Sequence, residues 1–363
     1  MAKKIIIFLV FTLAALAMFL AGYLISKKSL TSGQNQQALI NNSLVSRFQE
    51  APERHVSPIG LFTLSRDRAA FPTLSANGKE ILFYNPENGE IRSVSVQNMA
   101  GGSTLVAKIQ PSARQISWAT NKTLVATYSS GSIFYDLNSD SSKKLDNKIK
   151  NPALSRAGDK LAYNYFDVEA REGNISIADP IVEIFKTLMP TRFENWQIGW
   201  VNNDVLSLIA RPAPGNLISS LFTLDTKTKS LHSVLDSKNN LEVVWSPNGQ
   251  KIIYSYSNDP AQESGLYFMD LSNQEEVGLN TNFGASKCTW SIDNKTAYCA
   301  GGDSFIALDT SSANPTPENI PNIPKENINS STTATNLLLT SAEDYLIFIN
   351  SQNGRLYGLN LGQ

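Results

Sequence analysis

The chain has 363 residues, of which 42% are hydrophobic, with 31 Lys and Arg residues, 32 Asp and Glu residues and a formal net charge of −1. Four of the Lys residues lie within the first 28 positions, where there is no acidic residue, so the remainder carries 27 basic and 32 acidic side chains. This length is sufficient to bury a large core, and a mildly acidic remainder without a basic run argues against nucleic acid as a partner.

The amino terminus contains a long apolar run. Ile5–Ile25 is a stretch of 21 residues without a charge, between Lys3-Lys4 and Lys27-Lys28. That length crosses a bilayer core as a helix, so residues 1–28 are predicted to be a transmembrane signal anchor, with the membrane as a partner. A cleaved signal peptide is the alternative, but its apolar stretch is usually about 7–15 residues long and is followed by a small-residue cleavage site.

Residues 29–57 are polar and are predicted to be a tether between the anchor and the remainder of the chain. Within them, Leu39, Leu44, Val45 and Phe48 are compatible with a short amphipathic turn. A stalk helix or a partner contact at these positions is therefore the alternative to a solvated linker.

One short phrase recurs between residues 70 and 346, namely an apolar or Trp residue, a polar turn and then an apolar strand ending near Tyr. In its clearest copy, Trp245–Tyr254, the Asn248-Gly249 pair supplies the positive φ angles of a tight hairpin. The copies begin at Leu74, Trp118, Leu154, Trp200, Trp245, Trp290 and Leu339, and successive starts lie 36 to 49 residues apart. A period in the forties with several short strands is typical of β-propeller blades.

Each copy is followed by apolar segments that are predicted to be further strands of a blade. Third strands are predicted at Gly89–Val94, Ser132–Leu137, Asn174–Ala178, Ser220–Asp225, Gly265–Asp270, Ser304–Asp309 and Arg355–Leu359. Predicted fourth strands include Ile181–Phe185 and Leu231–Leu235, whereas the seventh copy has none. Leu61–Leu64 stands at the spacing of a fourth strand before Leu74, and its pairing with the last copy would close the ring. Residues 58–363 are therefore predicted to be all-β, a seven-bladed β-propeller of four-stranded antiparallel blades closed by this N-terminal strand.

The hairpin phrase also carries a resemblance to a known family. Trp245–Tyr254 (WSPNGQKIIY) and Leu74–Phe83 (LSANGKEILF) resemble the repeat of TolB-like propellers, a branch of the WD-repeat-like bacterial β-propellers. The resemblance covers the blades and not residues 1–57. It implies the fold but no ligand, because the matching residues build a turn, and TolB itself carries an additional amino-terminal domain that is not visible in this sequence.

The two cysteines, Cys288 and Cys299, are placed symmetrically about Asp293-Asn294. If those two residues form the hairpin loop, the cysteines are directly opposite on neighbouring strands and within reach of a disulfide. Two small buried thiols are the alternative. A disulfide would indicate an oxidising compartment. It would also decide the orientation of the chain in the membrane, because the positive charges on the two sides of the apolar run are almost equal. We therefore expect a single-pass protein of the cell membrane with its propeller on the extracytoplasmic side.

The inventory of residues for catalysis is small. Of the two His residues, His55 lies in the tether and His232 in a predicted fourth strand, where it is expected to point outward. This leaves no Ser-His-acid triad and no multi-His metal site in the ring. Asp136–Asp140 has oxygens at alternate positions, as a calcium loop does, but Ser141 stands where Gly is required and Asn147 where Glu is required. No metal and no cofactor is predicted.

Three consecutive blades have long loops between their second and third strands, and these loops are expected to cluster on one side of one face. Functional residues concentrate on loops that a rigid scaffold holds. The candidate binding residues are Asp167, Glu169, Arg171 and Glu172 in the first loop, Arg211 and Asn216 in the second, and Asn258, Asp259 and Glu263 in the third.

The sequence therefore predicts a non-catalytic, membrane-anchored, extracytoplasmic scaffold that binds an envelope or surface protein, or a glycan. The alternative is a glycan-active enzyme that uses carboxylates at the mouth of the propeller channel. Several Asp or Glu side chains converging there would favour hydrolysis, whereas small and apolar residues would favour binding.

Overall fold

The computed structural model of the protein describes residues 60–182, 184–211, 218–258, 263–301, 304–320 and 334–362. These belong to one compact unit, His55–Gln363. Their regular structure consists of β-strands and two short 3-10 helices, η1 (Met99–Gly101) and η2 (Ala285–Lys287), which confirms the predicted all-β class. The predicted anchor and tether lie outside the described residues. Within the described ranges, no helix is both long enough and apolar enough to span a bilayer.

Four antiparallel sheets contain four strands each, paired in sequence order. The first contains β2 (Ala70–Leu74), β3 (Glu80–Tyr84), β4 (Glu90–Ser95) and β5 (Ser103–Lys108). The second contains β6 (Gln115–Trp118), β7 (Thr123–Tyr128), β8 (Gly131–Asp136) and β9 (Ser141–Lys144). The third contains β10 (Ile149–Leu154), β11 (Leu161–Asp167), β12 (Glu172–Ala178) and β13 (Phe185–Thr191). Another, later in the chain, contains β21 (Cys288–Trp290), β22 (Thr296–Gly301), β23 (Ser304–Asp309) and β24 (Pro317–Asn319).

A seven-stranded sheet lies between the third and the last of these. It contains β14 (Trp196–Trp200), β15 (Val205–Ala210), β16 (Ile218–Asp225), β17 (Leu231–Trp245), β18 (Lys251–Ser257), β19 (Gly265–Asp270) and β20 (Glu275–Gly278). Strand β17 is 15 residues long; its first part pairs with β16 and its second part with β18, and the change of partner falls at Asn239. Positive φ angles at Ser237 (53°) and Asn240 (52°) bend the strand on either side of that point.

The remaining sheet joins the two ends of the unit. Its strands, in spatial order, are β1 (Leu61–Thr63), β27 (Leu356–Asn360), β26 (Tyr345–Asn350) and β25 (Ala334–Leu339). Strand β1 pairs antiparallel with β27, with Phe62 opposite Gly358. A side chain at Gly358 would collide with the Phe62 ring, since a Cβ there would lie 2.6 Å from it. The predicted closing strand is confirmed.

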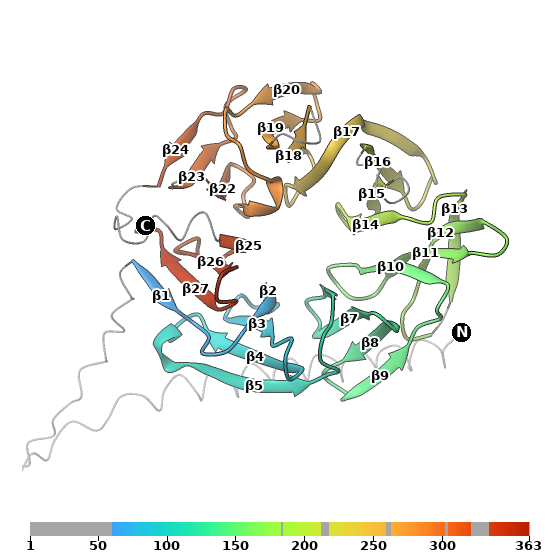
Figure 1. The fold of residues 1–363 in the computed structure, drawn as a ribbon, viewed down its shortest axis with the longest axis horizontal. Coiled ribbons are helices and arrows are strands. Elements are labelled where there is room, and N and C mark those ends of the chain that lie inside the picture. The colour runs from blue at the N-terminus through green and yellow to red at the C-terminus, as the bar shows by residue number, and fades with distance from the viewer. Residues whose placement is uncertain are drawn as a thin grey trace, which may run out of the picture. The chain divides into compact units, whose positions relative to one another are not determined.

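Within this unit the sheets follow one another around a ring (Figure 1). The innermost strands contact one another in turn, β2 with β6, β6 with β10, β10 with β14, β17 with β21, β21 with β25 and β25 with β2. The core lies between neighbouring sheets, where Ile81 of β3 packs in one cluster with Ile347 of β26, and Leu206 of β15 in another with Ile175 of β12. Closure of the series gives each sheet a neighbour on both faces, whereas outermost strands such as β5, β9 and β20 stay largely exposed.

The topology distinguishes two faces of the ring. Turns that join first to second strands and third to fourth strands lie on one face, here named the hairpin face. Loops that join second to third strands, and the connections from one sheet to the next, lie on the other, the connection face. The assignment follows because strand direction alternates within an antiparallel sheet.

A hydroxyl group secures the hairpin turn of the repeated phrase. In the copy beginning at Trp245, the buried Ser246 donates from Oγ to Asn248 Oδ1 (2.8 Å) and accepts from the Lys251 backbone N (2.9 Å). Gly249 in the same turn has φ 71°. Equivalent pairs of bonds are made by Ser75, Ser155, Ser291 and Thr340. The polar residues of the phrase therefore serve the turn itself.

The tryptophans of the phrase join neighbouring sheets. Each terminates an innermost strand, and its indole Nε1 reaches back to the preceding sheet or strand pair. The bonds run from Trp118 to Phe71 O (2.8 Å), from Trp200 to Ala153 O (3.0 Å), from Trp245 to Ser207 Oγ (3.0 Å) and from Trp290 to Val244 O (3.2 Å).

The third sheet departs from the prediction at its fourth strand. The sequence predicts that strand at Ile181–Phe185, but the strand is β13, Phe185–Thr191. Asp179 is the reason, because its Oδ1 accepts hydrogen bonds from the backbone N of Ile181 (2.8 Å) and of Val182 (3.0 Å). An Asp side chain that bonds the backbone in this way makes a turn, which the apolar composition of the segment conceals.

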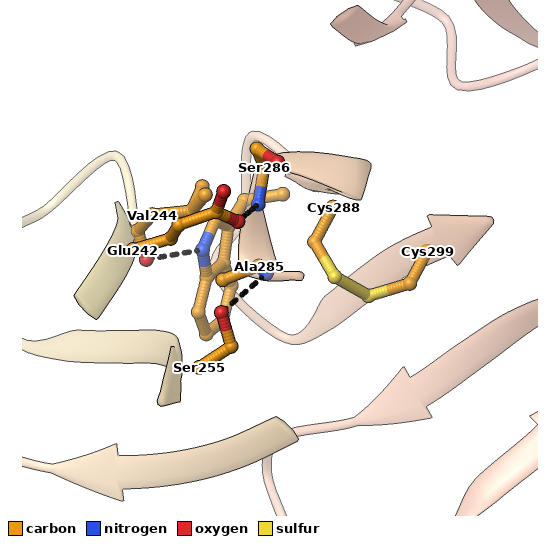
Figure 2. Close-up of a disulfide and its surroundings, with 8 residues drawn as sticks. Glu242, Val244, Ser255, Ala285, Ser286, Cys288 and Cys299 are labelled. Carbon is orange, nitrogen blue, oxygen red and sulfur yellow. Dashed lines mark hydrogen bonds between the residues drawn. A yellow bond between two sulfur atoms is a disulfide. The ribbon is translucent and has the colours of Figure 1, made fainter. Parts of the chain in front are cut away.

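A disulfide joins Cys288 of β21 to Cys299 of β22 (Figure 2). The two residues are directly opposite in the strand register, with their Cα atoms 4.0 Å apart. Both are buried. Beside them, the backbone N of Ala285 in η2 donates to Ser255 Oγ of the preceding sheet (2.9 Å; Figure 2). The cross-link therefore lies where one sheet meets the next.

Substitution of Gly249 by Ala tests the contact between neighbouring hairpin turns. Gly249 has φ +71°, and a Cβ there would lie 2.4 Å from Val201 Cγ1 in the turn of the preceding strand pair. Gly102 is the matched control, since it has φ +79° and open space around it. We expect Gly249→Ala to lower the free energy of unfolding by about 1–3 kcal/mol more than Gly102→Ala, because overpacking adds to the shared backbone strain. Equal losses in urea unfolding would contradict the contact.

Removal of the disulfide tests its contribution to stability. It closes a segment with a sequence separation of 11, for which chain entropy predicts a stabilisation of about 2–3 kcal/mol. The double variant Cys288→Ala, Cys299→Ala is expected to have a free energy of unfolding that is lower by this amount, as measured by urea denaturation. A reducing agent should produce a similar loss in the parent protein and none in the variant. A variant as stable as the parent would show that the bond adds nothing.

Candidate functional site

A hollow of about 630 Å³ opens on the connection face of the third sheet. It is named the polar hollow and is lined by Tyr165, Asp167, Ala170, Glu172, Gly173, Asn174, Pro190, Thr191 and Arg192. The walls are the β11–β12 loop on one side and the end of β13 on the other. Two of the residues predicted from the sequence, Asp167 and Glu172, are thus brought together with a guanidinium group that was not predicted, that of Arg192.

Asp167 is held in place by its own loop and by a lysine. Its Oδ1 accepts from the backbone N of Glu169 (3.0 Å) and of Ala170 (3.2 Å), and its Oδ2 accepts from Lys148 Nζ (2.7 Å). The hydrogen bond from Lys148, together with those from the backbone, lowers the pKa of Asp167 below its usual value. The loop turns at Arg171, whose φ is 53°. Glu169 and Arg171 therefore shape the loop, and neither lines the hollow.

An apolar groove of about 460 Å³ adjoins the polar hollow and shares Pro190, Thr191 and Arg192 with it. Its remaining lining residues are Met189, Phe193, Trp196, Ala210, Ile218, Ser220, Phe222 and Leu231, from β13 to β17. Phe193 and Ile218 are 53% and 44% exposed, whereas Trp196 is buried and donates from its indole Nε1 to Thr191 Oγ1 (2.8 Å). The groove thus has a fixed aromatic floor and an exposed apolar rim.

This groove is not predicted from the sequence. Two apolar residues in the sequence belong to the rim of the groove. They are Phe193, in the connection from the third sheet, and Ile218, at the start of β16. Each stands in a segment that could equally be core, and only the pairing of the strands leaves both of them at the surface.

The other described candidate residues line neither the polar hollow nor the apolar groove. Arg211 donates to Gln197 Oε1 (2.7 and 3.0 Å) and to Leu241 O (3.3 Å), so it braces β14 against β17. Asn258 and Glu263 are exposed on the β18–β19 loop and line neither the hollow nor the groove. The two remaining candidates, Asn216 and Asp259, lie outside the described residues.

A third cavity, of about 580 Å³, opens among the ends of innermost strands and the turns of the hairpin face. It is named the tryptophan pocket and is lined by Arg156, Trp200, Val201, Asn202, Asn203, Val244, Trp245, Ser246, Pro247, Thr289 and Trp290. Neither Asp nor Glu is among these residues. Three tryptophans of the repeated phrase therefore line this pocket in addition to bonding the preceding sheet or strand pair.

The calcium-like stretch forms an ordinary turn. The Asp136 carboxylate accepts from the backbone N of Asn138 (2.9 Å) and from Ser139 Oγ (2.8 Å), and the bond from Ser139 contributes most to lowering its pKa. Across the residues that are described, no group of three or more His, Cys, Asp or Glu side chains is arranged to hold a metal ion. His232 is exposed on β17, in agreement with the expected outward orientation.

The members of a polar and aromatic cluster on β17–β20 contact one another. The Glu276 carboxylate accepts from the hydroxyls of Tyr254 and Tyr256 (3.0 Å for the latter) and pairs with Lys238 Nζ (3.1 Å). Lys238 also lies 3.9 Å from the ring centroid of Tyr256, which stacks on Tyr267. Burial raises the pKa of Tyr267 to about 12. These contacts link β17, β18, β19 and β20 to one another.

Comparison with known proteins gives the fold. No protein-family model and no curated protein sequence matches the chain. An oligogalacturonate lyase in complex with manganese superposes with a TM-score of 0.60 at 11% identity, over 84% of this chain and 93% of that one. The β-propeller domain of Cps50 (Swd1) from Myceliophteria thermophila gives 0.57 at 9%, over 83% and 99%. A chain of the mitotic checkpoint complex gives 0.56 at 11%, over 90% and 99%. These likenesses show a β-propeller fold and nothing of the function.

Acidification of a Lys148 variant tests the electrostatics of the polar hollow. The pKa of an Asp carboxyl in the unfolded chain is about 3.9. When the pKa in the folded state is lower than this, the ionised carboxylate stabilises the fold at any pH above about 3.9. That stabilisation is lost as the pH falls through the folded-state pKa. In Lys148→Met we expect the Asp167 carboxyl carbon to titrate at higher pH by NMR, because its main partner is gone. Lys144→Met removes the same charge from β9 and should leave that titration unchanged. An unaltered Asp167 curve in the Lys148 variant would contradict the assignment.

Proposed function

We propose that the protein is a non-catalytic binding scaffold, tethered to the cell membrane on its extracytoplasmic side, and that its ligand is an envelope or surface protein. The observation that carries this proposal is the junction of the polar hollow and the apolar groove at Pro190–Arg192. Protein interfaces combine an apolar centre with a polar rim. The exposed Phe193 and Ile218 supply the apolar centre. The polar rim consists of Asp167, Glu172 and Arg192.

The number of blades that we propose is seven. Five sheets have four strands each. Strand β17 acts as the fourth strand beside β16 and as the first strand beside β18, so the seven-stranded sheet represents two blades that share one strand. The seven copies of the hairpin phrase support the same number.

The tryptophan pocket bears on the glycan-active alternative. Glycoside hydrolysis generally requires two carboxyl groups on either side of the scissile bond, and the residues lining this pocket include none. This pocket therefore does not supply the pair of carboxyl groups that the glycan-active alternative needs. The structures of similar fold include both an oligogalacturonate lyase and a chain of the mitotic checkpoint complex, so the fold by itself favours neither class.

Two features support the proposed location. Ile5–Ile25 has the length and composition of a membrane-spanning helix. The disulfide between Cys288 and Cys299 is typical of proteins in an oxidising compartment. A transmembrane anchor followed by a disulfide-bonded propeller is consistent with an extracytoplasmic location.

Crosslinking and affinity purification from membranes test the proposed surface. Phe193→Ser removes an exposed aromatic ring from the groove rim, and an apolar anchor of this kind commonly contributes enough for the recovered partner to fall at least about tenfold. Recovery is measured by quantitative mass spectrometry after crosslinking.

Leu105→Ser is the matched control for this experiment. Leu105 lies on β5 of the first sheet and is 57% exposed, against 53% for Phe193. Partner recovery should equal that of the parent. If the two variants recover the same amount of every envelope protein, or if the parent recovers none, the groove is not the binding surface.

A further inference from the structure

The turn between β12 and β13 exposes four large apolar side chains. Ile181, Val182, Ile184 and Phe185 are 68%, 59%, 73% and 68% exposed. They are named the apolar turn. Single exposed apolar residues are common on protein surfaces, whereas several side by side mark a contact with a partner or a membrane. Removing this much apolar surface from water is favourable, so the turn has a reason to be covered.

Hydrogen bonds form on both flanks of the apolar turn. Asp179 caps it through the bonds to the backbone N of Ile181 and Val182. On its far side, Lys186 Nζ donates to Thr226 O of the next sheet (2.7 Å). The described residues on both sides of the turn are therefore held to the ring by hydrogen bonds.

The apolar turn and the point where the tether enters lie on the same face of the ring. As the turn between a third and a fourth strand, it belongs to the hairpin face. Strand β1 runs antiparallel to β27, with Leu61 opposite Leu359, and Gly60 O accepts from the Asn360 backbone N (3.1 Å). The chain therefore enters β1 at the end where β27 finishes, and a third strand finishes on the hairpin face. The polar hollow and the rim of the apolar groove open on the opposite face.

We propose that the apolar turn inserts into the surface of the lipid bilayer to which the chain is tethered, so that the hairpin face rests against the membrane. This inference rests on the proposed tether. About 35 residues separate Ile25 from β1, and even a fully extended chain of that length spans at most about 120 Å. Such confinement raises the effective concentration of bilayer around the turn. Four exposed side chains on a convex turn suit penetration among lipid headgroups.

The orientation has a consequence for the binding surface. With the hairpin face toward the bilayer, the connection face points away from it. The polar hollow and the apolar groove are then presented to proteins of the envelope. The two faces of the ring take different partners, lipid on one and protein on the other.

Site-specific photocrosslinking to lipid tests the proposal. The full-length protein is reconstituted into nanodiscs of phosphatidylcholine and phosphatidylglycerol, with p-benzoyl-phenylalanine at Val182 in one variant and at Val168 in the other. The two positions form a matched pair, because both are valines in segments next to β12 and their exposed fractions are 59% and 58%. Val182 lies on the hairpin face and Val168 on the connection face. After irradiation, phospholipid adducts at each position are counted by mass spectrometry.

At least fivefold more phospholipid adducts at Val182 than at Val168 is the expected result. Equal numbers, or adducts at Val182 made chiefly to a second copy of the protein, would overturn the insertion while leaving the tether intact. A separate measurement isolates the tether, since the parent protein must remain with the nanodiscs in alkaline carbonate. Release into carbonate would overturn the proposed anchor, and the insertion with it.

Discussion

Pairing of β1 with β27 is the constraint on which the remainder of the structure depends. Without it the last sheet would have three strands and an unpaired edge, and exposed edges invite pairing with other chains. The pairing joins residues about 300 positions apart through a strand of only three residues, Leu61–Thr63. Phe62 reinforces it by covering Gly358 and by an edge-to-face contact with Tyr345 at 5.7 Å. Everything between these ends is then confined to a closed series of sheets.

Closure also determines how the two faces differ. Because β1 completes a sheet in the fourth-strand position, its direction is set by β27, and the chain must enter on the hairpin face. The same topology places the long second-to-third loops on the connection face. Entry of the chain on the hairpin face therefore follows from this pairing, whereas the polar hollow lies on the connection face, and the proposed division between lipid and protein contacts is built on that difference.

The sequence was most informative where local chemistry determines local structure. Asn248-Gly249 predicts a hairpin because few residues tolerate its φ angles, and the symmetry of Cys288 and Cys299 about that kind of turn predicts their register. It was misleading at Ile181–Phe185, where apolar composition resembles a strand but Asp179 makes a turn. The apolar groove was missed for a different reason. Phe193 and Ile218 meet only after two sheets pack together, and no local pattern records which apolar residues that packing leaves outside.

The long strand β17 gives one part of the ring a distinct kind of join. Elsewhere one sheet meets the next through a connecting segment, side-chain contacts and isolated hydrogen bonds, such as the one from the Thr120 backbone N to Arg156 O (2.8 Å). Between β16 and β18 the join is a backbone ladder through β17, with irregularities of register on both sides of Asn239. A partner bound in the groove beside β16 would therefore be linked to β18–β20 through main-chain hydrogen bonds of a single sheet.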